Sequence, residues 1–276
     1  MKPAWLRILP LAAIAAVGYS GVASSQTMSQ LVAGAKAEGE LTVIALPRDW
    51  CNYGALIDGF KASYGLMVNE LNPDAGSGDE VEAIKANKGN KGPQAPDVID
   101  VGLSSANGDV GTAADAGLQY FAQLNKNGNF VPTIGKAGTL AQGATPVILR
   151  WDYNALADRD TLKGNPAVTV VVPETGVVAG VYVQAISAYA PHPNAAKLWM
   201  EFLYSDAGQL GWLKGYCHPI RFQNLVESKK VPPEMLAALP PASSYAKAVF
   251  PTLDQQAQAK GVITKQWDSV VGANVK

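Results

Sequence analysis

Aromatic and acidic side chains follow two strand-like segments of the chain, at the positions where those segments end. The first segment, residues 41–46, is an apolar run that predicts a buried strand, and the loop after it carries Trp50 and Tyr53. The second segment, residues 145–150, is also a predicted strand, and it ends just before Trp151 and Asp152. Because open α/β sheets bind ligands at the carboxyl ends of their strands, these positions predict a surface that contacts a small molecule.

Patterns for covalent or metal chemistry are weak in this sequence. Gly76, Ser77 and Gly78 do not form the G-x-S-x-G motif that exposes a nucleophilic serine. The two histidines, His192 and His218, each precede a proline in a loop, where neither makes a good base for a catalytic triad. No spacing typical of metal ligands is found, so the sequence predicts no enzyme, no cofactor and no metal site.

Ser77 has two interpretations that the sequence leaves open. With Glu80 it fits the S-x-x-E capping box, which predicts a helix over residues 78–87. The start of such a helix presents backbone N–H groups that can bind an anion, so Ser77 is a candidate ligand contact. In the other interpretation, Ser77 only caps its helix.

The elements around these residues alternate between strands and helices. After residues 41–46, helical spacing continues until Gly65, and a second strand is predicted over residues 66–71. This βαβ pattern predicts an α/β fold. Further strands are predicted over residues 97–101, 145–150 and 168–172, with a long extended run over residues 177–187.

The N-terminal residues have the features of a secretory signal. Lys2 and Arg7 are positively charged, residues 8–17 are apolar, and small residues suitable for cleavage follow from Ala23. The apolar run is too short to span a bilayer comfortably. Residues 1–25 therefore predict a signal peptide that is removed from an exported, periplasmic protein.

The charge and the cysteine content of the 276-residue chain limit its function further. Without Lys2 and Arg7, 20 basic residues face 23 acidic residues, and no basic patch with interleaved aromatic residues is found, which argues against nucleic-acid binding. The two cysteines, Cys51 and Cys217, enter a compartment that permits disulfides. They form either one bridge or two unpaired small side chains.

The order of these elements resembles a known family. The segment EFLYSDAGQLGWLKGYCHPI follows the shape FL-S-x-x-G-Q-x-x-x-x-x-x-G-Y-x-x-P. From residue 41 to about residue 272, the chain resembles the periplasmic substrate-binding proteins of ABC importers, in particular the polyamine and iron(III) group. The resemblance implies a monomer with a two-lobed type II α/β fold that closes on a small solute and docks on a membrane permease. The first lobe would comprise residues 26–106 and 178–225, and the second lobe residues 107–177 and 226–276.

The resemblance also implies ligand-binding residues. Trp50 and Tyr53 resemble the W-x-x-Y pair that stacks on the ligand in polyamine receptors. Tyr216 resembles the tyrosine of the G-Y-x-x-P motif, which faces the ligand. Placing Trp50 and Tyr216 in one cleft also brings Cys51 and Cys217 together. The other candidate contacts are Ser104 near the end of the third strand, Trp151 with its neighbour Asp152, Tyr182 in the return strand, and Asp268 in the last helix. Each aromatic residue could instead pack in the core of a lobe.

Differences from the family leave the solute open. The return strand carries Tyr182 near the place where polyamine receptors have an acidic residue, and the adjacent tyrosines of iron receptors are absent from the sequence. A cation would therefore rely on aromatic faces and on Asp152 or Asp268. An organic cation, an anion at the start of the Ser77 helix and a small zwitterion all remain candidates.

The chain also lacks a stretch that the family has after about Ala106. It is shorter than the family by roughly eighty residues, which is too many for a trimmed loop, so an internal deletion and a truncated second lobe are expected. Such a lobe would expose strand edges and apolar faces. We therefore expect a solute-binding receptor. A deleted relic that binds nothing is the alternative, and an exported enzyme is the least favoured hypothesis.

Overall fold

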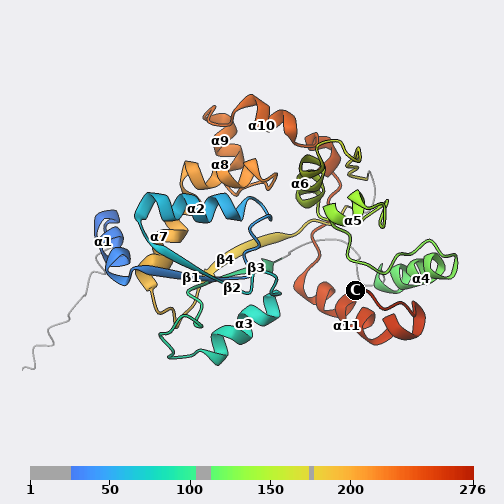
Figure 1. Ribbon diagram of the computed structural model, residues 1–276, viewed down its shortest axis with the longest axis horizontal. Coiled ribbons are helices and arrows are strands. Elements are labelled where there is room, and N and C mark those ends of the chain that lie inside the picture. The colour runs from blue at the N-terminus through green and yellow to red at the C-terminus, as the bar shows by residue number, and fades with distance from the viewer. Residues whose placement is uncertain (1–25, 104–112, 174–176) are drawn as a thin grey trace, which may run out of the picture.

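A four-stranded sheet forms the framework of the chain (Figure 1). The structure is a computed structural model that describes residues 26–103, 113–173 and 177–276. The strands lie in the order β2-β1-β3-β4, in which β1, β2 and β3 run parallel and β4 is antiparallel to β3. Their bounds are β1 Glu40–Ile44, β2 Met67–Leu71, β3 Val98–Leu103 and β4 Val181–Ile186. The predicted α/β class is confirmed.

Helices cover both faces of this sheet. In Figure 1, α2, α7 and α8 lie on one side of the strands and α3 lies on the other, with α1 beside α7. The apolar residues Leu56, Ile57 and Phe60 recur at helical spacing in α2, and all three are buried. Phe60 packs edge to face against Trp199 and Phe202 of α7, which forms the main core. These helices are α1 Met28–Glu38, α2 Tyr53–Tyr64, α3 Ser77–Ala86, α7 Pro193–Tyr204 and α8 Asp206–Lys214.

Two carboxylates hold strands and helices of this framework together. Asp97 is fully buried and accepts hydrogen bonds from the backbone N–H groups of Thr42 and His192, each at 2.7 Å. Glu38 accepts a hydrogen bond from the backbone N–H of Asn194 at the start of α7, where a negative charge is favourable. These contacts fix β1, β3 and α7 relative to one another.

The remaining helices form smaller groups beside the sheet. Helix α4 packs against α11 around Leu118, Phe121 and Trp267, and α5 packs against α6. Both pairs lie to the right of the sheet in Figure 1. These helices are α4 Ala113–Lys126, α5 Ala137–Ala141, α6 Asp152–Leu162, α9 Phe222–Glu227, α10 Pro233–Ala238, the 3-10 helix η1 Ala242–Tyr245 and α11 Leu253–Val270.

Two predicted strands are absent from the structure. Residues 145–150 and 168–172 run as irregular chain, so the prediction of strands there is wrong. A strand needs a neighbour for its backbone hydrogen bonds, and outside the sheet the described residues contain a single isolated bridge. Val147 and Leu149 are consequently 84% exposed. The extended run predicted over residues 177–187 is confirmed in part, because it contains β4.

Helix α3 begins one residue earlier than the capping box predicts. Gly76 is the N-cap residue, and its backbone N–H donates to the Asp79 carboxylate at 3.0 Å. Ser77 is the first residue of the helix, so the prediction that it caps the helix is wrong. The Glu80 carboxylate accepts hydrogen bonds from the Asp100 backbone and from the Ser77 side chain, and Asp79 takes the position of the acidic residue in the box.

Some sequence predictions concern residues outside the described ranges. The predicted signal peptide of residues 1–25, the candidate contact Ser104 and the deletion after about Ala106 all lie there. The proposed lobe boundaries also stay predictions. Within the described ranges, no helix has both the length and the apolar character that crossing a membrane requires.

Candidate functional site

Aromatic side chains from separate elements gather around Asp100 of β3. Trp50, in the loop before α2, contacts Tyr153 of α6 edge to face, with ring centroids 6.4 Å apart. The indole of Trp151 donates a hydrogen bond to the hydroxyl of Tyr182 in β4. Burial raises the pKa of both Tyr153 and Tyr182, and the negative charge of Asp100 raises it further. Both tyrosines therefore lie close enough to sense this one carboxylate.

A chain of hydrogen bonds leads from the core to Asp100. The Trp199 indole N–H donates to Gln184 Oε1 at 3.2 Å, and Gln184 Nε2 donates to the Tyr53 hydroxyl at 2.7 Å. The Tyr53 hydroxyl donates in turn to Asp100 Oδ2 at 2.7 Å. Gln184 lies directly opposite Asp100 in the β3–β4 pair, so the register of these strands assembles the chain.

Burial shifts the pKa values of Tyr53 and Asp100, the last two members of this hydrogen-bond chain. Desolvation raises the pKa of Asp100 to about 6, and the hydrogen bonds from Tyr53 and Gln184 oppose that rise. Desolvation also raises the pKa of Tyr53 well above its ordinary value, and the charge of Asp100 adds to this effect. Tyr53 therefore keeps its proton and remains a hydrogen-bond donor to Asp100 at neutral pH.

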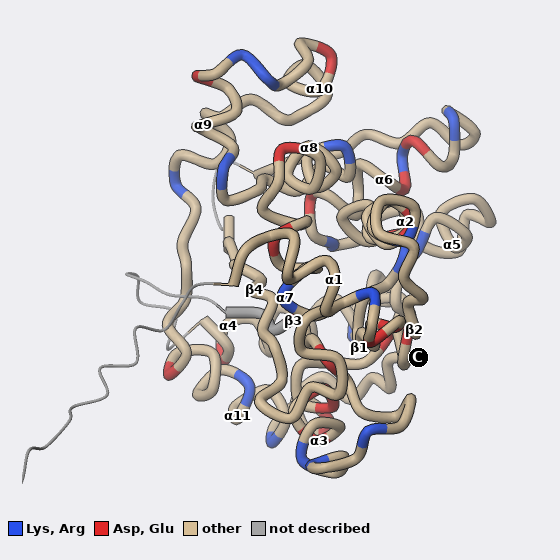
Figure 2. The backbone as a smooth tube through the Cα atoms, turned by 90° about the vertical axis from the view of Figure 1, so that its left-hand side faces the viewer, with Lys and Arg blue, Asp and Glu red and all other residues tan. Residues whose placement is uncertain are grey.

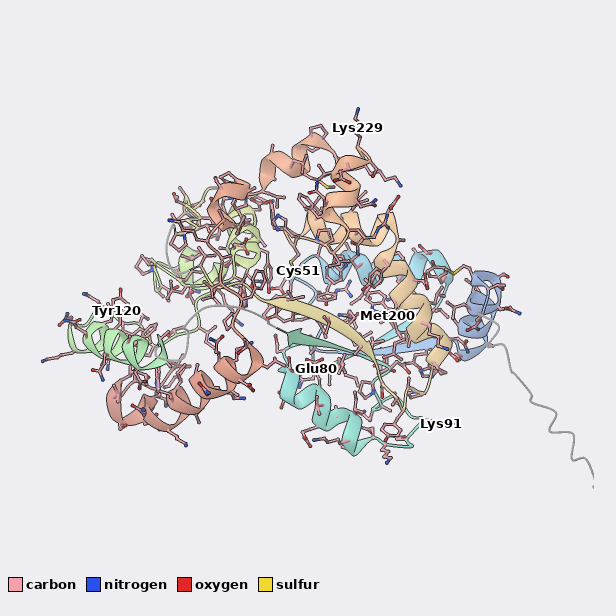
Figure 3. All side chains as sticks on the ribbon, turned by 180° about the vertical axis from the view of Figure 1, so that it is seen from behind. Cys51, Glu80, Lys91, Tyr120, Met200 and Lys229 are labelled. Atoms are coloured by element: carbon pink, nitrogen blue, oxygen red, sulfur yellow. A yellow bond between two sulfur atoms is a disulfide. The ribbon has the colours of Figure 1, made fainter. Side chains whose placement is uncertain are left out.

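A second carboxylate, that of Glu80, approaches Asp100 from α3. Figure 3 shows Glu80 on the side of the sheet opposite Cys51. Glu80 is 1% exposed, and its Oε2 accepts a hydrogen bond from the Asp100 backbone N–H at 2.6 Å. Desolvation raises the pKa of Glu80 to about 7 and the charge of Asp100 contributes to the rise, while hydrogen bonds from the Asp100 backbone and from Ser77 oppose it.

The described residues place no cation against these two carboxylates. Among their ion pairs, none includes Asp100 or Glu80. Arg150 does act on Tyr153, whose pKa it lowers, but its guanidinium is paired with Asp158 at 2.7 Å. Basic and acidic residues are interspersed along the rest of the backbone in Figure 2. The site is therefore negatively charged when Asp100 and Glu80 ionise.

Helix α6 is held at both ends by side chains from the C-terminal part of the chain. The Tyr216 hydroxyl donates to Asp160 near the end of α6. The Tyr245 hydroxyl donates to Asp152 Oδ2 at the start of α6, at 2.6 Å. Tyr245 also packs edge to face against His218, with centroids 5.8 Å apart, and burial lowers the pKa of this histidine. Tyr216 and Tyr245 thereby hold the helix that carries Tyr153 at both of its ends.

A disulfide joins Cys51 to Cys217, with Cα atoms 5.4 Å apart. Cys51 follows Trp50, and Cys217 follows Tyr216, so the bond ties together two loops that carry predicted site residues. Gly215 is required at this crossing, because a Cβ there would overlap the backbone of Cys51. The disulfide favoured by the resemblance is thus found in the structure.

The structure brings together some of the predicted contacts and separates others. Tyr53 and Tyr182 interact with Asp100 directly, whereas Trp151 reaches it through Tyr182 and Trp50 through Tyr153. Tyr53 is 4% exposed, so it contributes its hydroxyl while its ring packs in the core against Trp212. The other candidates lie farther out: Asp152 binds Tyr245, Tyr216 binds Asp160, Ser77 reaches the site through Glu80, and Asp268 is exposed on α11.

Four residues of this arrangement were not predicted as site residues from the sequence. They are Glu80, Asp100, Tyr153 and Gln184. Asp100 does leave a signal, because it is a carboxylate inside an otherwise apolar strand, and Tyr153 directly follows the predicted Asp152. Glu80 and Gln184 leave none, because their roles depend on the pairing of β3 with α3 and β4.

The chain matches a model of a known protein family. Residues 92–255 match the family model described as bacterial extracellular solute-binding protein, which is more than half of the 276 residues. The matched segment contains Asp100, Tyr153 and Gln184, whereas Tyr53 and Glu80 precede it. A comparison with curated proteins returned no match.

Proposed function

Because the chain belongs to the bacterial extracellular solute-binding proteins, we propose that it captures a small polar solute and delivers it to the membrane permease of an ABC importer. Membership supports a role in transport, outside the cytoplasm, in which a solute is bound and a transporter is contacted. The finer proposal is a periplasmic monomer, exported by the signal peptide of residues 1–25. Its solute is a polyamine-like cation or another small organic ion.

One observation supports this function most strongly. Tyr153 of α6 and Tyr182 of β4 lie within electrostatic reach of Asp100, a carboxylate for which the described residues supply no cationic partner, and Trp50 packs against Tyr153. Trp50 precedes α2, Tyr182 belongs to β4, and Tyr153 belongs to α6. Binding sites for small molecules combine such aromatic walls with a few polar groups that fix orientation.

The two sides of this arrangement suggest how a solute is captured. Trp50 and Asp100 belong to the sheet and its loops, while Trp151 and Tyr153 belong to the start of α6. We propose a type II two-lobed receptor in which these sides close on the solute by a hinge movement. The hinge includes the segment of residues 177–187 that enters β4, since it connects the two sides.

A truncated second lobe is part of the same proposal. The described part of the second lobe has helices but no sheet of its own, and its strand-like segments expose Val147, Leu149 and Val171 at 84%, 84% and 73%. Such exposure favours the alternative in which the chain is an internally deleted relic of a receptor and binds nothing.

An exported enzyme is the less favoured alternative, since solute-binding families are typically non-enzymatic. His192 lies 2.9 Å from the buried Asp97 and serves the junction of β3 with α7. His218 packs between the rings of Phe222 and Tyr245. The contacts of both histidines are therefore explained by packing and hydrogen bonding within the fold.

Intrinsic tryptophan fluorescence of the processed chain tests the proposed function. The chain is titrated with polyamines, amino acids, phosphonates, sugars and ferric citrate. We expect a saturable change for one organic cation, because Trp50 and Trp151 lie at the site. Trp151→Phe should reduce that change, whereas Trp267→Phe, in the α4–α11 pair, should retain it. A chain that is folded by circular dichroism but silent toward the whole panel would support the relic.

A further inference from the structure

The hydrogen-bond chain that ends at Asp100 has a fixed direction. An indole N–H can only donate, so Trp199 requires the oxygen of the Gln184 amide, at 3.2 Å. The amide nitrogen then points to Tyr53 and donates to its hydroxyl oxygen at 2.7 Å. The hydroxyl proton of Tyr53 is left for Asp100 Oδ2, also at 2.7 Å. Trp199 thereby sets the orientation of every donor in the chain.

This direction favours an ionised Asp100. A hydrogen bond donated to a carboxylate stabilises its charged form, and those from Tyr53 and Gln184 both lower the pKa of Asp100 against desolvation. Trp199 is 0% exposed and Tyr53 is 4% exposed, so water does not compete for these donors. Asp100 itself is partly exposed, which leaves its charge available to a solute.

Among the residues that the structure describes, the titratable groups that interact with Asp100 are all acids. They are Tyr53 of α2, Glu80 of α3, Tyr153 of α6 and Tyr182 of β4. Arg150 also senses Tyr153, but its charge is balanced by Asp158. An anion would therefore meet repulsion at Asp100, and a cation would meet attraction in a site of reduced dielectric constant.

An amine fits these surroundings better than a metal ion. Within the described ranges, no three His, Cys, Asp or Glu side chains are grouped so that they could hold a metal. Aromatic rings attract organic cations, and Tyr153 and Tyr182 are aromatic side chains within electrostatic reach of the carboxylate. An ammonium group also brings N–H donors, which form strong hydrogen bonds with a carboxylate.

We propose that Asp100 determines the specificity of the site for a protonated amine, and that Trp199 and Gln184 are positioning residues that act through Tyr53 to keep its carboxylate an acceptor. The inference rests on the proposed solute-binding function. It adds the class of solute and the residues that select it.

Calorimetric titration with 1,4-diaminobutane, with acetate as the anionic probe, tests the role of Asp100. The processed chain should bind the diamine and not acetate. Asp100→Asn should weaken binding of the diamine by about 10- to 100-fold, the range for a lost hydrogen bond between charged groups. Asp115→Asn removes the same charge from an exposed position of α4 and should leave the affinity unchanged.

The pH dependence of the affinity tests the positioning residues. The affinity should rise as the pH passes through about 6, because Asp100 then ionises in the unliganded chain. Tyr53→Phe and Gln184→Met should move this midpoint to higher pH, because the carboxylate loses donors. Phe202→Leu, a change in the neighbouring core, should lower stability but leave the midpoint in place. Repeating the series in the Glu80→Gln background removes the titration of the second carboxylate.

The possible results separate the inference about Asp100 from the proposed receptor function. Equal affinities of the parent and Asp100→Asn for the diamine, or a solute that is an anion, would overturn the inference and leave the receptor function standing. Unchanged midpoints in Tyr53→Phe and Gln184→Met would overturn the positioning role alone. A folded chain that binds no compound of the panel would overturn the proposed function and the inference together.

Discussion

Replacing Glu80 by glutamine tests how strongly burial perturbs the carboxylates of the site. Desolvation raises the pKa of Glu80 from 4.5 to about 7 in the folded chain. The folded state therefore holds a proton between these pH values that the unfolded state has lost, so the free energy of unfolding must fall as the pH rises through this window. The side chain keeps its oxygen in Glu80→Gln, so the hydrogen bond from the Asp100 backbone can persist.

The size of this effect follows from the two pKa values. One pKa unit corresponds to about 1.4 kcal/mol, and partial solvation reduces the full difference, so the fall should be about 2 to 3 kcal/mol smaller in Glu80→Gln than in the parent. Urea unfolding followed by circular dichroism between pH 4.5 and 8 measures it. Glu82→Gln, an exposed position of the same helix, should keep the fall of the parent. If the free energy of unfolding fell equally with pH in the parent and in Glu80→Gln, the pKa of Glu80 would not be raised in the folded chain.

Three further changes test separate parts of the structure. Gly215→Ala should lower the free energy of unfolding by about 2 kcal/mol in urea titrations, because a Cβ would overlap the backbone of Cys51; an unchanged midpoint would show that this crossing is loose. Replacing Cys51 and Cys217 together by serine should cost about 2 to 5 kcal/mol in the same assay, and a variant as stable as the parent would argue against a stabilising bond. Replacing Val147 and Leu149 by threonine should change stability by less than about 0.5 kcal/mol, since both are 84% exposed, and a larger loss would mean that they are buried in solution.

Local patterns in the sequence were enough to predict most elements of the sheet and its helices. Helical spacing in α2 and the apolar run of β1 are each set by neighbouring residues, and both elements are found close to their predicted positions. The loop between them carries Trp50, whose place near the end of the sheet follows from the same pattern. The strands predicted over residues 145–150 and 168–172 failed because a strand also needs a neighbour, which propensity does not supply.

Local sequence patterns could not predict the hydrogen-bonded residues of the site. Tyr53 and Gln184 lie 131 positions apart in the sequence, and only the pairing of β3 with β4 brings Gln184 to the Tyr53 hydroxyl. Glu80 has the spacing of a capping box, yet burial against β3 directs its carboxylate to the Asp100 backbone instead. The pKa of Asp100 is raised by burial in this packing, so no short sequence motif could predict the shift.

Native mass spectrometry of the processed chain, mixed with the full panel of solutes, tests most directly whether this protein is a receptor for a small organic cation. We predict a saturable one-to-one complex whose added mass corresponds to an amine. A chain that keeps its unliganded mass throughout the panel, or one that selects an anion, would contradict it.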